Sequence, residues 1–271
     1  MNEPALSPKR ARYLHRLRQE SRRVRLWQAA LFVGFFAFWE LSCRVGLSDG
    51  FLVSRPSRVA ATFLTLCRGG DVLVHVGVSC WETVAGFLLG TAAGTVVAVA
   101  MWWWPTLSRV LDPYLVVLNA LPKTALGPIF IVWMGAGTGA IIVTTLAISL
   151  IVTILNMYED FRATDAQKIR LMAAMGASRW QLLWMLVFPA NYATLLNTLK
   201  ANVGLSWVGV IMGEFLVSRA GLGYLIVYGS QVFNMDLVMT SVLLLLVAAV
   251  VMYRLVLWVE KLLYRVWGLK A

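Results

Sequence analysis

The sequence predicts an all-α polytopic membrane protein with about six transmembrane helices. Of its 271 residues, 60% are hydrophobic and 14% are charged, and the mean hydropathy is +0.75. Soluble domains are about 45–50% apolar and about 25% charged, so a single aqueous core could not bury this much apolar surface. Several apolar runs are long enough to cross a bilayer, which makes lipid the solvent for most of the chain.

A basic N-terminal segment sets the expected orientation. Its cations, which all precede the first apolar run, are Lys9, Arg10, Arg12, Arg16, Arg18, Arg22, Arg23 and Arg25. Such a cluster holds its end of a membrane protein in the cytoplasm and favours anionic lipid headgroups. We therefore divide the chain into a basic cytoplasmic arm, residues 1–25, and a transmembrane domain, residues 26–271. The net charge of +11 does not indicate nucleic-acid binding, because no nucleic-acid-binding motif accompanies it.

Six apolar segments are the expected membrane spans, and their even number places both termini in the cytoplasm. They are residues 26–43, 75–101, 110–134, 138–156, 192–217 and 236–259. The second span carries Gly86, Gly90 and Gly94 at four-residue spacing, so all three lie on one helix face. Such a face lets the backbone of another helix approach closely.

The third span has an unusual pattern. The tryptophan run 102–104 precedes it and marks a membrane–water interface, where Pro105 ends the second helix. Within the span, Pro113, Pro122 and Pro128 predict a helix broken at membrane depth.

Three connections are expected on the outer side. Residues 44–73 hold an amphipathic helix that would lie on the outer surface. Residues 135–140, with the sequence GAGTGA, are too short and too small for anything but a tight turn. Residues 217–236 form a segment punctuated by glycine, which could re-enter the membrane.

No residues in the chain form a recognisable catalytic centre. None of its six lysines follows a glycine, so the phosphate-binding P-loop of ATPases is missing. Cys43, Cys67 and Cys80 show neither metal-ligand spacing nor a disulfide framework. The chain is therefore not expected to be an enzyme, or to hold a metal or cofactor. If ATP drives its activity, ATP and magnesium would be bound by a separate subunit.

The polar segment 156–191 is the most distinctive part of the sequence. A first helix begins after Thr164 or Asp165 as N-cap and ends at Gly176, and a second begins at Ser178 and runs to Pro189. Two short helices that meet at a glycine would form a compact cytoplasmic knob, suited to a groove on a partner protein. The alternative is a loop helix that lies on the membrane surface.

This segment resembles a known motif. It reads Arg170-Leu171-Met172, three residues, Gly176, nine residues, and Leu186-Val187-Phe188-Pro189. The signature loop of permease subunits in bacterial ABC importers reads Glu-Ala-Ala, three residues, Gly, nine residues, Ile-x-Leu-Pro. The glycine and the proline match at the right separation, whereas the Glu-Ala-Ala triplet is not retained.

The resemblance covers about residues 50–260. Residues 81–94, 119–141 and 204–226 are similar to the second-span, third-span and fifth-span regions of the nitrate/sulfonate/taurine-type branch. It implies the type I ABC importer permease fold, multi-pass in the bacterial plasma (inner) membrane. It also implies three kinds of partner: a second permease subunit (a second copy or a paralogue), two cytoplasmic ATPase subunits, and a periplasmic or extracellular solute-binding protein.

The resemblance makes residues 156–191 the loop that couples the permease to its ATPase. The residues assigned to it are Asp165, Arg170, Leu171, Met172, Ala173, Ala174, Gly176, Ala177, Ser178 and Pro189. ATP-driven closure of the ATPase pair would push such loops together and rock the spans between inward-facing and outward-facing states.

Polar residues at membrane depth are candidates for the translocation path. They are Asn119, Lys123, Lys200, Asn202, Ser206 and Glu214. Lys123 could steer an anion, or it could reach an interface or pair with a carboxylate. Lys200 could likewise reach the interface. Glu82 or Glu214 could pair with these lysines or line the path, although Lys200 and Glu214 would be about 21 Å apart along one helix and could not pair within it. Asn119, Asn202 and Ser206 could line a polar pore or form hydrogen bonds between helices.

The residues leave the transported solute open. The resemblance implies a small solute such as nitrate, sulfonate or taurine, and a thiamine- or riboflavin-related precursor is the alternative. A stand-alone secondary transporter is the alternative of a different class. It would need no long helical loop, and such transporters often show two repeated halves, which we do not find in this sequence.

Overall fold

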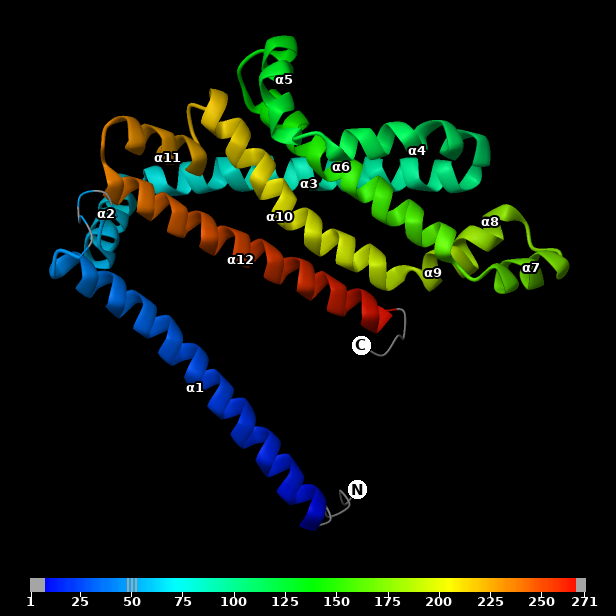
Figure 1. Ribbon diagram of the computed structural model, residues 1–271, viewed down its shortest axis with the longest axis horizontal. Helices are drawn as coiled ribbons and strands as arrows, with labels where there is room; N and C mark the ends of the chain where they lie inside the picture. The colour runs from blue at the N-terminus through cyan, green and yellow to red at the C-terminus, as the bar shows by residue number, and fades with distance from the viewer. Residues whose placement is uncertain (1–7, 48, 50, 52, 267–271) are drawn as a thin grey trace. The chain divides into compact units, whose positions relative to one another are not determined.

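The computed structural model describes residues 8–47, 49, 51 and 53–266, and the regular elements among these residues are all helices (Figure 1). The first seven residues of the predicted arm and the last five residues of the chain lie outside the described part. The chain forms two compact units, one up to Leu64 and one from Thr65 onward.

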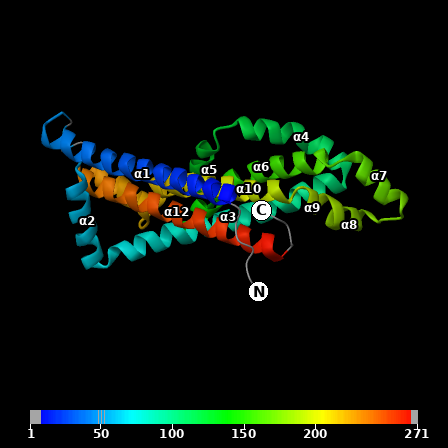
Figure 2. The ribbon, with the colours of Figure 1, turned by 90° about the horizontal axis from the view of Figure 1, so that it is seen from below.

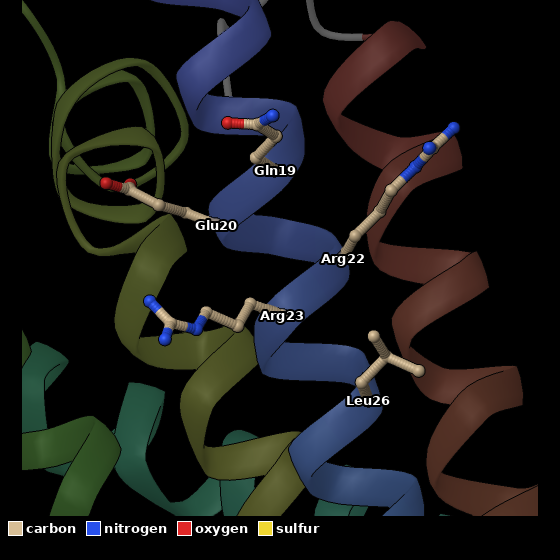
Figure 3. Close-up of a pocket in the computed structure, with 5 residues that line it drawn as sticks. All are labelled: Gln19, Glu20, Arg22, Arg23 and Leu26. Carbon is tan, nitrogen blue, oxygen red and sulfur yellow. The ribbon is translucent and has the colours of Figure 1, made fainter.

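The first unit is built on one long helix, α1 (Pro8–Arg44), which has 37 residues. At 1.5 Å per residue it is roughly 55 Å long, whereas the hydrocarbon core of a bilayer is about 30 Å thick. The predicted basic arm and the first span are therefore continuous, with no break near residue 25. Figure 3 shows Gln19, Glu20, Arg22, Arg23 and Leu26 projecting from neighbouring turns of this helix.

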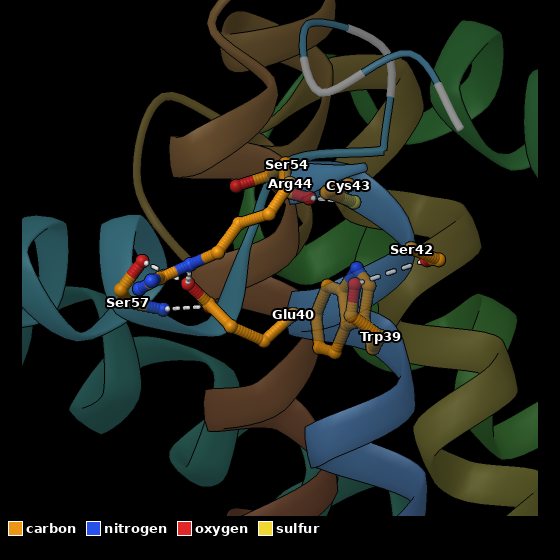
Figure 4. Close-up of polar contacts among 7 residues, drawn as sticks. All are labelled: Trp39, Glu40, Ser42, Cys43, Arg44, Ser54 and Ser57. Carbon is orange, nitrogen blue, oxygen red and sulfur yellow. Dashed lines mark hydrogen bonds and ion pairs between the residues drawn. The ribbon is translucent and has the colours of Figure 1, made fainter. Parts of the chain in front are cut away.

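A carboxylate joins α1 to the start of the next helix, α2 (Pro56–Gly69). Glu40 accepts hydrogen bonds from the backbone N–H of Ser57 (3.1 Å), from the Ser57 hydroxyl (3.0 Å) and from Nε of Arg44 (2.8 Å) (Figure 4). The N–H groups of the first turn of a helix have no partner within the helix, so a carboxylate there stabilises the helix start. The predicted helix within residues 44–73 is confirmed.

The core of the second unit is formed by three long helices. They are α3 (Asp71–Trp103), α6 (Thr138–Ala163) and α10 (Tyr192–Val217), and each packs against the other two. A Cβ built at Gly94 would lie 2.6 Å from Cβ of Thr153, and one at Gly90 would lie 3.1 Å from Cβ of Ser149. The predicted close approach along this glycine face is confirmed, and α6 is the helix that uses it.

The third span is broken, as expected, but only at Pro122 and not at Pro113 or Pro128. It consists of α4 (Pro105–Ala120), the short η1 (Lys123–Leu126) and α5 (Gly127–Met134), with a 93° bend at the break. Pro122 lies in the break. Pro128 lies in the first turn of α5, where no N–H donor is needed. The predicted interruption at Pro113 is wrong, because α4 continues through it.

Among the described residues, five helices are long and apolar enough to cross a membrane, or six spans if the bent pair counts as one. The segments that pass are Gln19–Arg44, Asp71–Trp103, Thr138–Ala163, Tyr192–Val217 and Met235–Leu262, with the bent pair Pro105–Ala120 and Lys123–Met134. The segment Met235–Leu262 is part of α12 (Met235–Val266). The predicted outer segment 217–236 contains α11 (Leu222–Gln231), which packs on α12 and α10.

Four short elements form the connection between α6 and α10. They are α7 (Ala166–Ala174), α8 (Arg179–Leu182), a π-helical turn η2 (Leu183–Val187) and α9 (Phe188–Ala190). In both ribbon views α7 and α8 lie at one end of the second unit (Figures 1 and 2). The second predicted helix ends at Ala190, one residue beyond the predicted Pro189. The π-helical turn η2 widens this helix just before the proline, which has no N–H and would clash with a preceding carbonyl.

Candidate functional site

The turn between α7 and α8 depends on the backbone conformation of Gly176. Its φ angle is +86°, and the N–H of Ala177 donates to the carbonyl of Met172 at 3.0 Å, so the chain closes α7 with a left-handed residue. Among the described atoms, none lies within 4 Å of a Cβ added at Gly176. Glycine is therefore required here by the backbone conformation and not by lack of space.

Both helices of the knob have side-chain caps at their N-termini. Asp165 accepts a hydrogen bond from the N–H of Gln167 at 2.8 Å, so Asp165 and not Thr164 caps α7. Ser178 accepts from the N–H of Gln181 at 3.3 Å, and Gln181 accepts from the N–H of Ser178 at 2.8 Å. This reciprocal capping box fixes the start of α8. The predicted helix–glycine–helix geometry is confirmed.

The knob, which comprises α7, α8 and the π-helical turn η2, presents large apolar side chains that are exposed in this chain. Leu171 is 63% exposed, Met175 80% and Met185 67%. The predicted loop residues Asp165, Arg170, Ala173, Ala174, Gly176, Ser178 and Pro189 are exposed, and Met172 and Ala177 are half-buried. Large exposed apolar residues beside charged ones occur where a protein contacts a partner or a membrane.

The opposite side of the knob is anchored to the spans. Leu183 and Val187 are buried against Ala98 of α3 and against Met157 and Phe161 of α6. Tight burial on both helices makes the second half of the knob part of the core, so its position follows that of α3 and α6.

A second anchor joins the knob to the end of α3. Arg179 donates from Nη1 to the backbone carbonyl of Trp103 at 2.9 Å, and the Trp103 and Trp180 rings meet edge to face at 6.1 Å. A cation on the last carbonyls of a helix is a favourable C-terminal contact. The sequence reasoning missed both Arg179 and Trp180. The four-residue spacing of Trp180, Trp184 and Phe188, which contact one another in turn, was an available signal.

Two of the path candidates bind each other. Lys123 donates from Nζ to the carbonyl oxygen of Asn119 (3.1 Å) and to its side-chain oxygen (3.0 Å). The break after α4 leaves its last carbonyls without helical partners, and the ammonium group satisfies one of them.

Lys200 forms an ion pair between helices. Its Nζ lies 2.8 Å from Oε1 of Glu260 on α12, and the two side chains are 24% and 14% exposed. The alternative in which Lys200 pairs with Glu82 or Glu214 is therefore wrong, because its carboxylate partner is Glu260 on α12.

Asn202 and Ser206 lie inside the α3–α6–α10 core. Asn202 donates from Nδ2 to the hydroxyl of Thr91 (3.0 Å) and to that of Thr153 (2.6 Å), so it bridges all three helices. Both Asn202 and Ser206 are 0% exposed. In this structure Asn202 joins the three helices, whereas the Ser206 hydroxyl is buried without a hydrogen-bond partner among the described residues.

Glu214 stabilises the start of α11. Its carboxylate accepts hydrogen bonds from the Ser79 hydroxyl and from the N–H of Gly223, and the Ser79 hydroxyl in turn accepts from the N–H of Leu222 at 2.7 Å. The N–H of Gly221 donates to Nδ1 of His75 at 3.0 Å. No local sequence pattern predicts Ser79 or His75 as partners, because both contacts join segments that are distant along the chain.

Comparison with known proteins identifies the family of this chain. Residues 86–265 match the family described as binding-protein-dependent transport system inner membrane component. The match covers more than half of the chain, so the chain belongs to this family and is a transmembrane permease of the ABC importer type.

Individual relatives agree with the predicted resemblance. The chain is 24% identical to the aliphatic sulfonates transport permease protein SsuC of Bacillus subtilis, over 72% of this chain and 71% of that protein. It is 26% identical to the formylaminopyrimidine transport permease protein ThiX of Halalkalibacterium halodurans, over 71% of this chain and 76% of that one. It is 25% identical to the taurine transport system permease protein TauC of Escherichia coli, over 84% of this chain and 85% of that protein.

A solved structure shows the same fold. It is described as showing inward-facing conformations of the MetNI methionine ABC transporter. One of its chains matches with a TM-score of 0.59 at 18% identity, over 71% of this chain and 94% of that chain. The predicted type I permease fold is confirmed.

Proposed function

We propose that this chain forms the translocation pathway for a small solute in an ATP-driven importer, and that residues 156–191 are its docking site for the ATPase. The observation that carries the proposal is the knob itself. Its free surface exposes Leu171, Met175 and Met185, while Leu183 and Val187, on the side that faces the spans, are buried against α3 and α6. Such an element passes a push from a bound partner to the spans, because packed helices shift as units.

The proposed partners follow from this role. Two ATPase subunits in the cytoplasm would bind ATP and magnesium, and each would hold one knob. A second permease, identical or a paralogue, would complete the pathway. A solute-binding protein would deliver the solute on the periplasmic or extracellular face. The knob and both termini would then lie in the cytoplasm of a bacterial inner-membrane protein.

The proposed solute is small, such as nitrate, sulfonate or taurine, with a thiamine- or riboflavin-related precursor as the second candidate. Names among the relatives include aliphatic sulfonates, taurine, formylaminopyrimidine and riboflavin. A stand-alone secondary transporter is the remaining alternative, and it differs in needing no ATPase.

The test is uptake by the complex reconstituted in proteoliposomes, with Gly176→Val as the variant. A β-branched residue at φ +86° costs on the order of 1–2 kcal/mol and would turn α7 away from α8. We expect solute uptake per ATP hydrolysed to fall at least about tenfold, an effect of about 1.4 kcal/mol, while membrane insertion is retained.

The matched control is Gly77→Val. Gly77 lies on an exposed face of α3, where a new Cβ meets no described atom within 4 Å and φ is not positive. Unchanged coupling in Gly176→Val, or uptake by the purified chain without an ATPase, would refute the proposed docking role.

A further inference from the structure

Two carboxyl groups are buried side by side at the end of the second unit opposite the knob. Glu82 comes from the first half of α3 and Glu214 from the last turn of α10, and each is 1% exposed. The two side chains lie within hydrogen-bonding reach of each other. The knob contacts the other end of α3, at Trp103. In Figure 1, α11 and the knob likewise lie at opposite ends of this unit.

The hydrogen bonds of this pair are unequally distributed. Glu214 accepts from the Ser79 hydroxyl and from the N–H of Gly223. Glu82 lies within reach of the Thr138 hydroxyl, but its Oε2 is buried and has no hydrogen-bond partner among the described residues. In the part of the chain that the structure describes, neither carboxyl forms an ion pair.

Such an arrangement lacks a positive charge. Two adjacent carboxylates in a low-dielectric interior repel each other, and removing even one from water is costly unless an opposite charge is present. Ionisable groups at membrane depth are retained where they have a function. The pair therefore requires either a cationic group or a shared proton.

A cavity adjoins the pair and carries the complementary charge. Its volume is about 430 Å³, and Glu82, Thr138, Ser218 and Arg219 are among the residues that line it. Arg219 is exposed and forms no ion pair with a described residue. One cavity thus presents an acid and a guanidinium group, each without an ionic partner in the described part of the chain.

We propose that this cavity binds a small zwitterionic solute, with its ammonium group at Glu82 and its acidic group at Arg219. Guanidinium binds carboxylate or sulfonate in a two-pronged geometry, and a carboxylate is the strongest acceptor for an ammonium group. A bare monovalent cation suits the site less well, because Arg219 repels it. A simple anion would meet Glu82 as a like charge.

This inference rests on the proposed function, since it names the solute class of the same pathway. If the knob faces the cytoplasm, the cavity lies on the outer side, where a binding protein would release its cargo. Lys123, which could steer an anion on sequence grounds, donates to Asn119, and Lys200 is paired with Glu260.

The test is direct binding to the purified full-length chain in detergent, measured as a shift in melting temperature with saturating probe. The probes are a matched set: taurine carries both charges, ethanesulfonate only the negative one and ethylammonium only the positive one. We expect stabilisation by taurine alone. We expect Glu82→Gln and Arg219→Gln each to weaken its affinity at least about tenfold.

Two control variants repeat these chemical changes on exposed residues that do not line the cavity. They are Asp112→Asn on α4 and Arg254→Gln on α12, and both should bind taurine like the unmodified chain. Equal stabilisation by ethylammonium or sodium, with no effect of Arg219→Gln, would overturn the inference in favour of a cation site.

If no probe binds and Glu82→Gln stabilises the empty chain, the pair shares a proton only and the inference fails. That failure would leave ATP-dependent uptake intact, so it is distinguishable from failure of the proposed function.

Discussion

The two ends of the second unit hold their polar groups in opposite ways. At one end, the knob of α7 and α8 exposes Leu171 and Met175 beside charged residues and satisfies its backbone through local caps such as Asp165 and Ser178. At the other end, Glu82 and Glu214 are buried, and the hydrogen bonds to Glu214 come from α3 and α11. The first surface can receive a large rigid partner, whereas the second has room only for something small.

This contrast matches the two tasks of a coupled transporter. A protein partner needs an exposed and firmly mounted surface, because force has to pass through it. A small solute needs a few converging polar groups in a concave site. The helices α3, α6 and α10 connect the two ends, so a change at one end can reach the other only if this packing is tight. Four experiments test that relation, in order of decreasing effect.

The largest effect is expected from Gly90→Leu, which should disrupt both the knob and the cavity beside Glu82, because both depend on the packing of α3 against α6. A Cβ at Gly90 would meet the Ser149 side chain and lie 3.1 Å from the carbonyl of Leu146, so α3 and α6 must separate. Overpacking of this kind costs about 1–3 kcal/mol or more. We expect little folded protein by size-exclusion chromatography. Normal yield and uptake would show that the contact between α3 and α6 is not required.

The next effect concerns the knob alone. Arg179→Gln removes the cation from the Trp103 carbonyl, and Arg179→Lys restores a charge without the planar guanidinium. We expect ATP hydrolysis to continue while uptake falls about tenfold in the Gln variant, with partial rescue in the Lys variant. Equal loss of hydrolysis and uptake would mean that Arg179 only supports folding.

A smaller effect is expected at the opposite end from Glu214→Gln. The amide group keeps the shape of the side chain but brings an NH2 donor toward the N–H of Gly223 or the Ser79 hydroxyl. Leaving a buried donor unsatisfied costs about 1–3 kcal/mol. Thermal unfolding should show a lower Tm, whereas Asp112→Asn, which is exposed on α4, should not change it.

The smallest effect is expected from Lys123→Ala. The ammonium group contacts Asn119 at the end of α4 and is only half-buried, so its loss should lower Tm by less than about 2 °C. Uptake should stay within about twofold, or about 0.4 kcal/mol. A tenfold loss of uptake for an anion would restore the sequence-based hypothesis that Lys123 steers the solute.

The sequence was a good guide to the helices and to the knob. The fifth span was predicted at residues 192–217, and α10 has these bounds. The glycine stripe on α3 and the break at Pro122 were also predicted correctly. These features depend on residues within one or two helical turns, where hydrophobic periodicity, missing N–H donors and capping side chains act directly.

The pairings between helices could not be predicted in the same way. Lys200 and Glu260 are 60 residues apart, Asn202 and Thr91 are 111 apart, and Leu222 and Ser79 are 143 apart. Several carboxylates were plausible partners for Lys200, and no local pattern selects one. Which groups meet depends on how each helix is rotated about its own axis and on its axial position relative to the helices that pack against it.

The amino-acid order by itself therefore determined that the chain spans a membrane, where most of its spans lie, and that a capped polar knob interrupts them. Composition and local hydrogen bonding are sufficient for that. Only the tertiary structure decided that Glu82 and Glu214 meet beside a cavity that also contains Arg219. The reason is that charge balance in a low-dielectric interior depends on which side chains packing brings within a few ångströms of one another.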